Sequence, residues 1–180
     1  MRSLLRRRDF GLLWTAGLIT FTGDWVLFAG LPLVVYGLTG STLSTSGIFI
    51  AALLPRVAWG SLAGVLVDRW DRRRTLVFAN LGQTVVLLPL LAVDSADRIW
   101  IAYVVAFIHA SLEQVVEPAE GALLPRLVGE DDLVAANALN SLNNNLARLI
   151  GPALGGVAVA VAGSRASCSS TPRHSWPRPG

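Results

Sequence analysis

The stretch GVLVDRWDRRR, residues 64–74, decides how this chain folds, because it places a dense block of charge between two long apolar runs. Six of its last seven residues are charged, in a chain of which only 15% of residues are charged. Such a block needs water, whereas apolar runs of about 20 residues match a hydrocarbon core about 30 Å thick. The stretch, called the charged turn below, therefore predicts a short connection between two membrane-spanning helices at a membrane surface.

The composition agrees with this interpretation, since 53% of the 180 residues are hydrophobic and the apolar residues come in long runs. A soluble domain of this size mixes more charge between its apolar stretches. The sequence predicts an all-α membrane protein with about five transmembrane helices. A basic arm (1–9) precedes a transmembrane bundle (10–162), whose expected spans are 10–36, 45–67, 75–93, 99–123 and 138–162.

Arginine, the only basic residue besides two histidines, is distributed unevenly between the expected loops. Nine arginines fall on the side of the charged turn and one falls on the opposite side, before the tail. Because positive charge stays in the cytoplasm, the N-terminus is expected there, in a multi-pass protein of the cell (inner) membrane. Topology explains the excess of basic residues, so no nucleic-acid partner is expected.

The last residues, 163–180, differ from the rest of the chain. They are rich in serine, proline and arginine, and they show neither a helical period nor a membrane-length run. They also put three arginines on the side expected to be poor in them. This composition predicts a truncated or frame-shifted reading frame, and the alternative is a genuine disordered tail.

Sequence patterns for other kinds of chemistry are not found. The single cysteine, Cys168, excludes an internal disulfide framework and cysteine-type metal spacing. There is no phosphate-binding Gly-Lys-Ser/Thr loop and no nucleophilic triad arrangement. We therefore expect no enzyme, no cofactor and no metal site.

The charged turn resembles the signature found between the second and third helices of the major facilitator superfamily. That pattern is a glycine, three residues, an acid, a basic residue, one residue, usually a glycine, and two basic residues. This sequence supplies Gly64, Asp68, Arg69, Arg72 and Arg73. It departs from the pattern at Asp71, where the family usually has glycine. The resemblance implies that Asp68 helps to lock the inner end of the second helix against the other half of the transporter, and the alternative role is a topology anchor.

Two further segments resemble exporter branches of the same superfamily. The run Gly151, Pro152, Ala153, Leu154, Gly155 and Gly156 looks like the end of the fifth-helix antiporter signature, although its upstream glycines are missing. Residues 117–119 and 124–128 look like the branch that contains macrolide and siderophore exporters. The fourth-helix arginine signature of many proton-coupled members is absent.

This resemblance covers residues from about 9 to 162 and implies most of the N-terminal six-helix half of a larger fold. It implies a secondary active transporter, with the lipid bilayer, a small-molecule substrate and protons as partners. The expected activity is proton-coupled efflux of a small amphipathic compound, drug-like or siderophore-like, here apparently truncated, with the missing C-terminal half as a further partner. Two alternatives are a non-transporting fragment of such a protein and a lipid transporter of the same fold.

Charged residues inside the expected spans are the first candidates for a functional site. Asp24 and Arg56 lie at similar depth, about 18–21 Å from the cytoplasmic face at 1.5 Å per residue. Opposite charges at similar depth on consecutive antiparallel helices predict a pair. Asp24 could then carry the coupling proton with Arg56 as its partner, and the alternative is a static structural pair.

Two polar stripes on the fourth and fifth spans complete the set of candidates. Spacings of four, four and three place His109, Glu113, Glu117 and Glu120 on one helical face. This face could bind substrate or relay protons, or its later members could simply lie near the surface where Pro118 ends or kinks the helix. Polar residues recur in the same way at Asn137, Asn140, Asn144 and Arg148. An ion pair from Arg148 to Glu113 or Glu117 is equally compatible with substrate contact and with charge neutralisation.

Small residues in two spans predict close approach of helices. Gly60 and Gly64 are four residues apart, as are Gly151 and Gly155, and such pairs let neighbouring backbones touch. Pro152 removes one backbone hydrogen bond and permits a bend.

Overall fold

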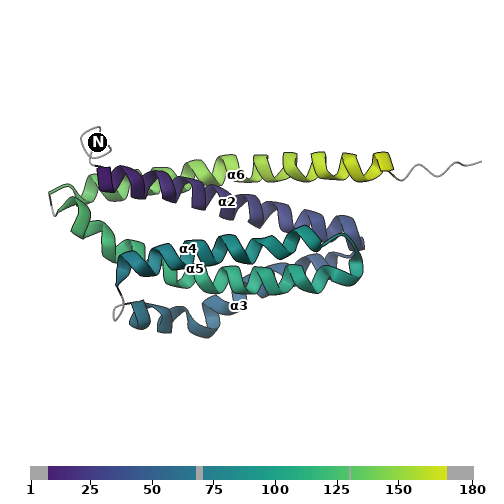
Figure 1. The fold of residues 1–180 in the computed structure, drawn as a ribbon, viewed down its shortest axis with the longest axis horizontal. Helices are drawn as coiled ribbons and strands as arrows, with labels where there is room; N and C mark the ends of the chain where they lie inside the picture. Colours follow the sequence, from purple (N-terminus) through teal and green to yellow (C-terminus); the bar gives the residue numbers. More distant parts are fainter. Residues whose placement is uncertain (1–7, 68–70, 130, 170–180) are drawn as a thin grey trace, which may run out of the picture.

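A computed structural model gives the backbone of residues 8–67, 71–129 and 131–169, and the side chains of residues 8–60, 71, 73–129 and 131–160. These residues form helices and short connections, without a strand (Figure 1). Two short 3-10 helices, η1 (Leu88–Ala92) and η2 (Ala96–Arg98), lie between the long helices. The long helices are α2 (Arg8–Thr39), α3 (Thr42–Val67), α4 (Arg72–Leu87), α5 (Ile99–Val128) and α6 (Leu133–Ser169).

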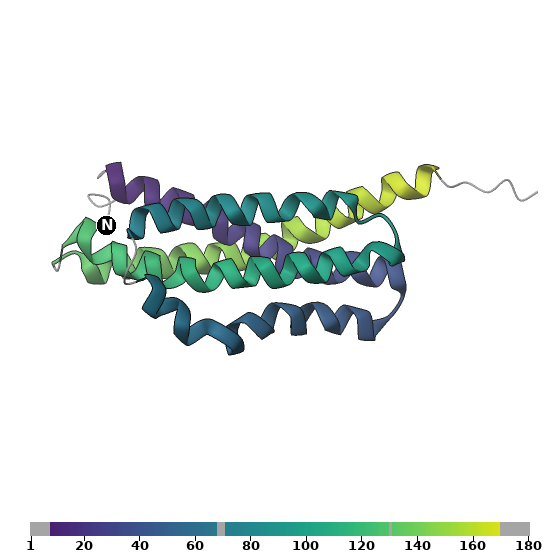
Figure 2. The same cartoon turned by 60° about the horizontal axis from the view of Figure 1, so that its bottom comes forward.

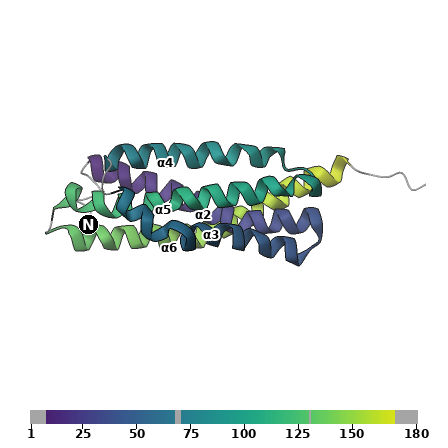
Figure 3. The ribbon, with the colours of Figure 1, turned by 90° about the horizontal axis from the view of Figure 1, so that it is seen from below.

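The long helices run alternately up and down, so the start of α2 and both ends of the charged turn lie at the same end of the bundle (Figures 1 and 2). Helix α5 occupies the middle, packing along α3 on one side and α4 on another, while α6 packs mainly along α2. Figure 3, seen from below, shows α5 between α4 and the lower helices. Each of the three apolar clusters in the bundle contains residues of α5.

Four helices are long and apolar enough to cross a membrane among the residues that the structure describes. They cover Arg8–Thr39, Thr42–Gly60, Arg73–Ala92 and Ala96–Val128. Together with the absence of strands from the described part of the chain, they confirm the all-α membrane class. Helix α6 includes the fifth expected span but is not among these four. A fifth crossing therefore stays a prediction.

The outer surface of the bundle is apolar on every long helix. Leu43, Leu91 and Val134 each keep more than 80% of their surface exposed, and many other large apolar side chains are more than half exposed. Exposed apolar area on this scale is unfavourable in water and favourable against acyl chains. The surface therefore agrees with a multi-pass protein surrounded by lipid.

Two helix ends differ from the sequence-based expectation. The loop expected at 124–133 is shorter, because α5 continues through Val128, and Pro118 lies inside this helix. Leu124 and Val128 are buried in a cluster with Phe10 and Leu139, and their burial stabilises the added helical turns. At the other end of the chain, α6 continues to Ser169 instead of ending near 162, so part of the expected tail is helical.

Local sequence explains two of the connections between helices: the turn after α2, and the charged turn at the other end of the bundle. Gly40 has a φ of +63°, and its N–H donates to the Tyr36 carbonyl at 2.7 Å, which ends α2 in the left-handed conformation that glycine favours. Asp71 is the N-cap of α4, and its carboxylate accepts a hydrogen bond from the Arg74 N–H at 2.9 Å. The aspartate that departs from the family pattern therefore starts the third long helix.

Helix α3 is bent near its middle. Trp59 has φ −141° and ψ 15°, outside the helical region, and Pro55 precedes it by one turn. Proline removes a backbone hydrogen bond and clashes with the turn that precedes it, so Pro55 loosens the helix on the N-terminal side of Trp59. The Trp59 ring packs edge-on against Phe107 at 5.6 Å between ring centres, so α5 supports the bend from one side.

The contact between α2 and α6 depends on two glycines. A Cβ atom on Gly151 would lie 2.3 Å from the Cβ of Trp25, and one on Gly155 would lie 2.9 Å from the Val26 carbonyl oxygen. The structure thus places both glycines directly against the α2 backbone. Gly156, the next residue, faces open space, since a Cβ there would have no neighbour within 4 Å.

Substituting these glycines should separate packing from helix propensity. Alanine in place of glycine stabilises a helix by up to about 1 kcal/mol, so Gly156→Ala should raise stability slightly. Gly151→Ala gains the same propensity but forces α2 and α6 apart, at a cost of about 1–3 kcal/mol. We expect Gly151→Ala to unfold at lower temperature than the wild-type chain in detergent micelles, and Gly156→Ala to unfold at the same or a higher temperature. Equal midpoints for the two variants would contradict this close contact.

Candidate functional site

Two pairs of ionisable side chains involve adjacent turns of α5. Oδ1 of Asp24 on α2 lies 3.4 Å from Nε2 of His109. Nη2 of Arg56 on α3 lies 3.5 Å from Oε1 of Glu113, one turn further along α5. Helix α5 therefore holds the partner of both candidate charges, and the two pairs join α2, α3 and α5 at similar depth.

The pair predicted from the sequence, Asp24 with Arg56, is not the arrangement in the structure. Helix α3 packs along α5 more extensively than along α2, so α5 supplies the nearest partner for Arg56. Asp24 faces α5 for a related reason, because α2 and α5 both contribute to the cluster around Leu31 and Ala106. The sequence argument rested on depth, and depth alone does not say which helix lies beside each charge.

The surroundings of the two pairs differ in exposure. His109 and Asp24 have only 10% and 21% of their side chains exposed, whereas Arg56 is 55% exposed. Glu113 also interacts electrostatically with Asp24, so the four groups form one network across three helices. The inner pair is enclosed by protein, and the outer pair reaches the surface of the bundle. Such an arrangement can hold a proton between Asp24 and His109 and respond to it through Glu113.

The remaining acidic candidates of α5 lie toward the end that carries the charged turn. Glu117 is exposed, while Glu120 is partly buried and hydrogen-bonds with the Asn140 side chain of α6. Near Glu120, the Thr20 hydroxyl donates to Oδ1 of Asn80 at 3.2 Å. The Thr20–Asn80 bond therefore joins α2 to α4, and the Glu120–Asn140 bond joins α5 to α6.

Arg148 does not form the expected ion pair with Glu113 or Glu117 within the described part of the chain. Its guanidinium lies over the Trp25 ring of α2, 5.4 Å from the ring centre. A guanidinium over an indole face is an attractive arrangement, and it gives a cation a partner where no carboxylate is near. The reason for the difference is the close α2–α6 contact at Gly151, which brings Trp25 beside the turn that carries Arg148.

The structure describes only some residues of the charged turn. Asp68 and Arg69 lie outside the described residues, and Gly64 and Arg72 are placed only as backbone in α3 and α4. Arg73 is exposed in the first turn of α4. The gating role of these five residues is therefore still a prediction.

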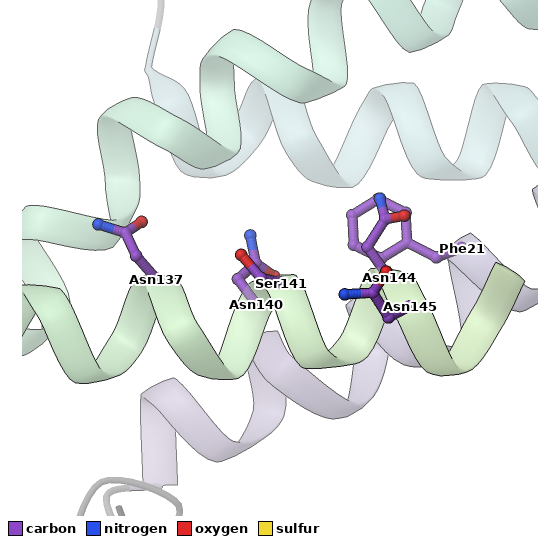
Figure 4. A pocket seen from close by; sticks show the side chains of 6 residues that line it. All are labelled: Phe21, Asn137, Asn140, Ser141, Asn144 and Asn145. Carbon is purple, nitrogen blue, oxygen red and sulfur yellow. The ribbon is translucent and has the colours of Figure 1, made fainter.

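An open pocket of about 370 Å³ lies along one face of α6 (Figure 4). Among the described residues, Phe21 of α2 is the one lining residue from another helix, and the others are Asn137, Asn140, Ser141, Asn144 and Asn145. The sequence stripe already contained three of these asparagines, but it missed Ser141, Asn145 and Phe21. The density of asparagine between residues 137 and 145 was the available signal, and only the structure shows which side chains share a face.

Asn143 lies on the face of α6 that packs against α2. It is fully buried, and its Nδ2 donates to the Trp14 carbonyl at 2.8 Å, while the Trp14 indole N–H donates to the Leu139 carbonyl at 3.0 Å. These two bonds join α2 to α6 next to the pocket. No group of three or more metal-binding side chains occurs among the residues with described side chains.

Comparison with known proteins identifies a family and several relatives that are similar to this chain. A family model described as transmembrane secretion effector matches residues 2–170. The chain is 28% identical over 163 residues to the uncharacterized MFS-type transporter YfiS of Bacillus subtilis, covering 89% of this chain and 38% of that protein. No solved structure matches the chain.

Two relatives carry substrate names. The chain is 24% identical over 147 residues to macrolide efflux protein A of Streptococcus pyogenes, which covers 81% of this chain and 36% of that protein. It is 26% identical over 151 residues to the staphyloferrin A transporter of Staphylococcus aureus, covering 82% of this chain and 38% of that protein. The chain thus spans well under half the length of these relatives.

A double-mutant cycle tests which charges interact. We expect Arg56→Gln and Glu113→Gln to be coupled by about 0.6–2 kcal/mol, the range found for polar contacts between membrane helices. Asp24→Asn and His109→Gln should be coupled to a similar extent. The pair Asp24 and Arg56 is the matched control and should show a smaller coupling energy. The measurement is the unfolding free energy of each variant in micelles, and a larger coupling for the control pair would contradict the structure.

Proposed function

We propose that this chain, which belongs to the transmembrane secretion effector family of the major facilitator superfamily, forms the N-terminal helical unit of a proton-coupled exporter. Its substrate would be a small amphipathic compound of the kind named for the relatives, drug-like or siderophore-like. The observation that supports this proposal most is the charge network on α5, where Asp24 meets His109 and Glu113 meets Arg56.

Proton coupling needs a group that gains and loses a proton inside the membrane. Charged groups in a bilayer are costly unless paired, and they usually mark an ion or substrate pathway. A carboxylate and an imidazole in contact can share one proton, and both are enclosed by apolar helices here. We therefore assign the coupling proton to the Asp24–His109 pair, in place of the Asp24–Arg56 pair that the sequence suggested.

Coupling also needs a way for the proton to change the shape of the protein. An ionised Asp24 repels the neighbouring Glu113, and protonation of Asp24 removes that repulsion. Glu113 then binds Arg56 more strongly, and Arg56 lies beside the bend of α3 at Pro55 and Trp59. In this proposal the proton acts on the bend of α3, whose far end leads into the charged turn.

The charged turn would act as the gate at the cytoplasmic face, with Asp68 as its acidic contact. Its arginines also fit the inner surface of the membrane, because cytoplasmic leaflets carry negative charge. This assignment places the N-terminus inside the cell. Gly64 would let α3 pack closely, Gly151 and Gly155 would do the same for α6, and Pro152 would allow α6 to bend during the cycle.

Transport in vesicles tests the coupling role of Asp24. The full chain is reconstituted in liposomes, and pH-gradient-driven movement of ethidium or a labelled macrolide is followed by fluorescence or counting. We expect Asp24→Asn to lower the gradient-driven rate at least tenfold, because the amide cannot carry the proton. Asp94→Asn is the matched control, since Asp94 lies in a connection and pairs only with the exposed Arg98 at 3.3 Å.

Both variants are compared at equal helicity and thermal stability, so that loss of fold is excluded. An Asp24→Asn chain that keeps the wild-type rate would contradict the proposed proton site. Wild-type vesicles that show no gradient-driven movement of either compound would favour the alternative, a non-transporting fragment of such a protein.

Cysteine labelling tests the orientation. With Cys168 replaced by serine, single cysteines are placed at Arg73 and Asp97, exposed residues at opposite ends of the bundle. We expect a membrane-impermeant maleimide added to intact cells to label Asp97→Cys and to spare Arg73→Cys, with the reverse in inside-out vesicles. Labelling of Arg73→Cys from outside would place the charged turn on the wrong side and overturn the orientation.

A further inference from the structure

The α6 pocket is lined by neutral hydrogen-bonding groups. Four carboxamides and one hydroxyl, from Asn137, Asn140, Ser141, Asn144 and Asn145, surround about 370 Å³ of space. Figure 4 shows these side chains along one side of α6, with the Phe21 ring beside Asn144. Each carboxamide offers two donors and an acceptor, and a hydroxyl offers one donor and two lone pairs. The volume falls in the range of small-molecule sites, about 300–1,000 Å³.

Most of these polar groups have no partner within the described part of the chain. Asn140 hydrogen-bonds with Glu120, whereas Asn137, Ser141, Asn144 and Asn145 have no side-chain hydrogen bond there. Unpaired amides are unfavourable against acyl chains, because lipid offers them no hydrogen bond. This face of α6 therefore meets water, a ligand or another polar surface, and not the hydrocarbon core.

Two charged residues on the helices around the pocket already have partners. Glu120 is bound by Asn140, and Arg148 lies over the Trp25 ring. None of the six lining residues is itself charged. A cationic or anionic ligand would lose its hydration here without gaining an opposite charge. The lining thus favours a neutral ligand with many hydrogen-bonding groups.

Phe21 adds an apolar surface to one side of the amides. A saccharide ring matches both features, because its hydroxyls donate and accept as carboxamides do and its C–H faces pack on an aromatic ring. We infer that the α6 pocket binds a neutral polyhydroxylated group, such as the sugar part of a glycosylated substrate. This inference rests on the proposed function and names the chemical class that the exporter would recognise.

Binding of a simple glycoside tests the inference. The full chain is placed in phosphatidylcholine nanodiscs, prepared without glucoside or maltoside detergents because these would compete for the pocket. Titrations with methyl β-D-glucopyranoside, choline and benzoate compare a neutral polyol with a cation and an anion. We expect saturable binding of the glucoside, measured by saturation-transfer NMR, and no saturable binding of choline or benzoate.

Variants of the lining residues test whether the glucoside binds in the pocket. Ser141→Ala should raise the Kd for the glucoside about 2- to 12-fold, which is the effect of losing one hydrogen bond. Asn144→Leu should raise this Kd at least tenfold. Asn144→Gln keeps the carboxamide and should retain part of the affinity. The matched control is Thr84→Leu, an exposed polar-to-apolar change on α4 at a residue that does not line the pocket, which should leave the Kd unchanged.

Several outcomes would overturn the inference. These are absence of saturable glucoside binding, equal binding by the Asn144→Leu chain, or stronger binding of choline or benzoate. Light scattering tests whether a second copy of the chain covers this face. If Asn144→Leu instead dissociates an oligomer, this face is a helix contact and not a ligand site. If glucoside binding fails while ethidium is still transported, the inference alone falls. If glucoside binds through Asn144 while transport fails, the proposed exporter function alone falls.

Discussion

The position of α5 between α2, α3 and α4 is the constraint on which the rest of the structure depends. An ionised side chain inside a bilayer needs a partner, and α5 carries the partners of both Asp24 and Arg56. It also contributes to all three apolar clusters, so its sequence must serve packing and charge at once. Alanines and valines face the neighbouring helices, and His109 and Glu113 interrupt them on successive turns. Any movement of α5 therefore changes apolar packing and both charged pairs together.

The bend of α3 is the point at which a change in these contacts can alter the shape of the helix. Arg56 follows Pro55 directly, and Trp59 departs from helical geometry within the same turn. Three contacts hold this region to α5: the Arg56–Glu113 pair, the Trp59–Phe107 ring contact and the close approach of Gly60 to Gln114. A helix that is already bent absorbs a further change at one point, whereas a straight helix would have to break backbone hydrogen bonds. The segment beyond the bend leads to the charged turn, so in the proposed mechanism a local change at Arg56 would reach that turn through this segment.

Much of the fold could be predicted from the sequence, because run length and charge density are properties of single segments. The all-α membrane class and the major facilitator resemblance are confirmed, and the bundle connects the segments in the expected order. Partner assignments could not be predicted in the same way. The partners of Asp24 and Arg148 depend on which helix lies beside them, and no periodicity within one segment encodes that. The end of α5 depends on burial of Leu124 and Val128 against α2 and α6, which is likewise a property of the assembled bundle.

Helix α6 shows how neighbouring residues of one type acquire different roles. Asn143 is buried and bonded to the Trp14 backbone, while Asn144 and Asn145 face the open pocket. One step along a helix turns the side chain by about 100°, so a run of asparagines supplies both an interhelical bond and a polar lining. The two glycines further along repeat this division, since Gly155 contacts α2 and Gly156 faces open space. Asn140 hydrogen-bonds with Glu120 of α5, but the other polar residues of the open face have no such bond within the described part of the chain, so packing of the described helices does not explain them. Their position on one face, beside Phe21, is the physical argument for the proposed binding role.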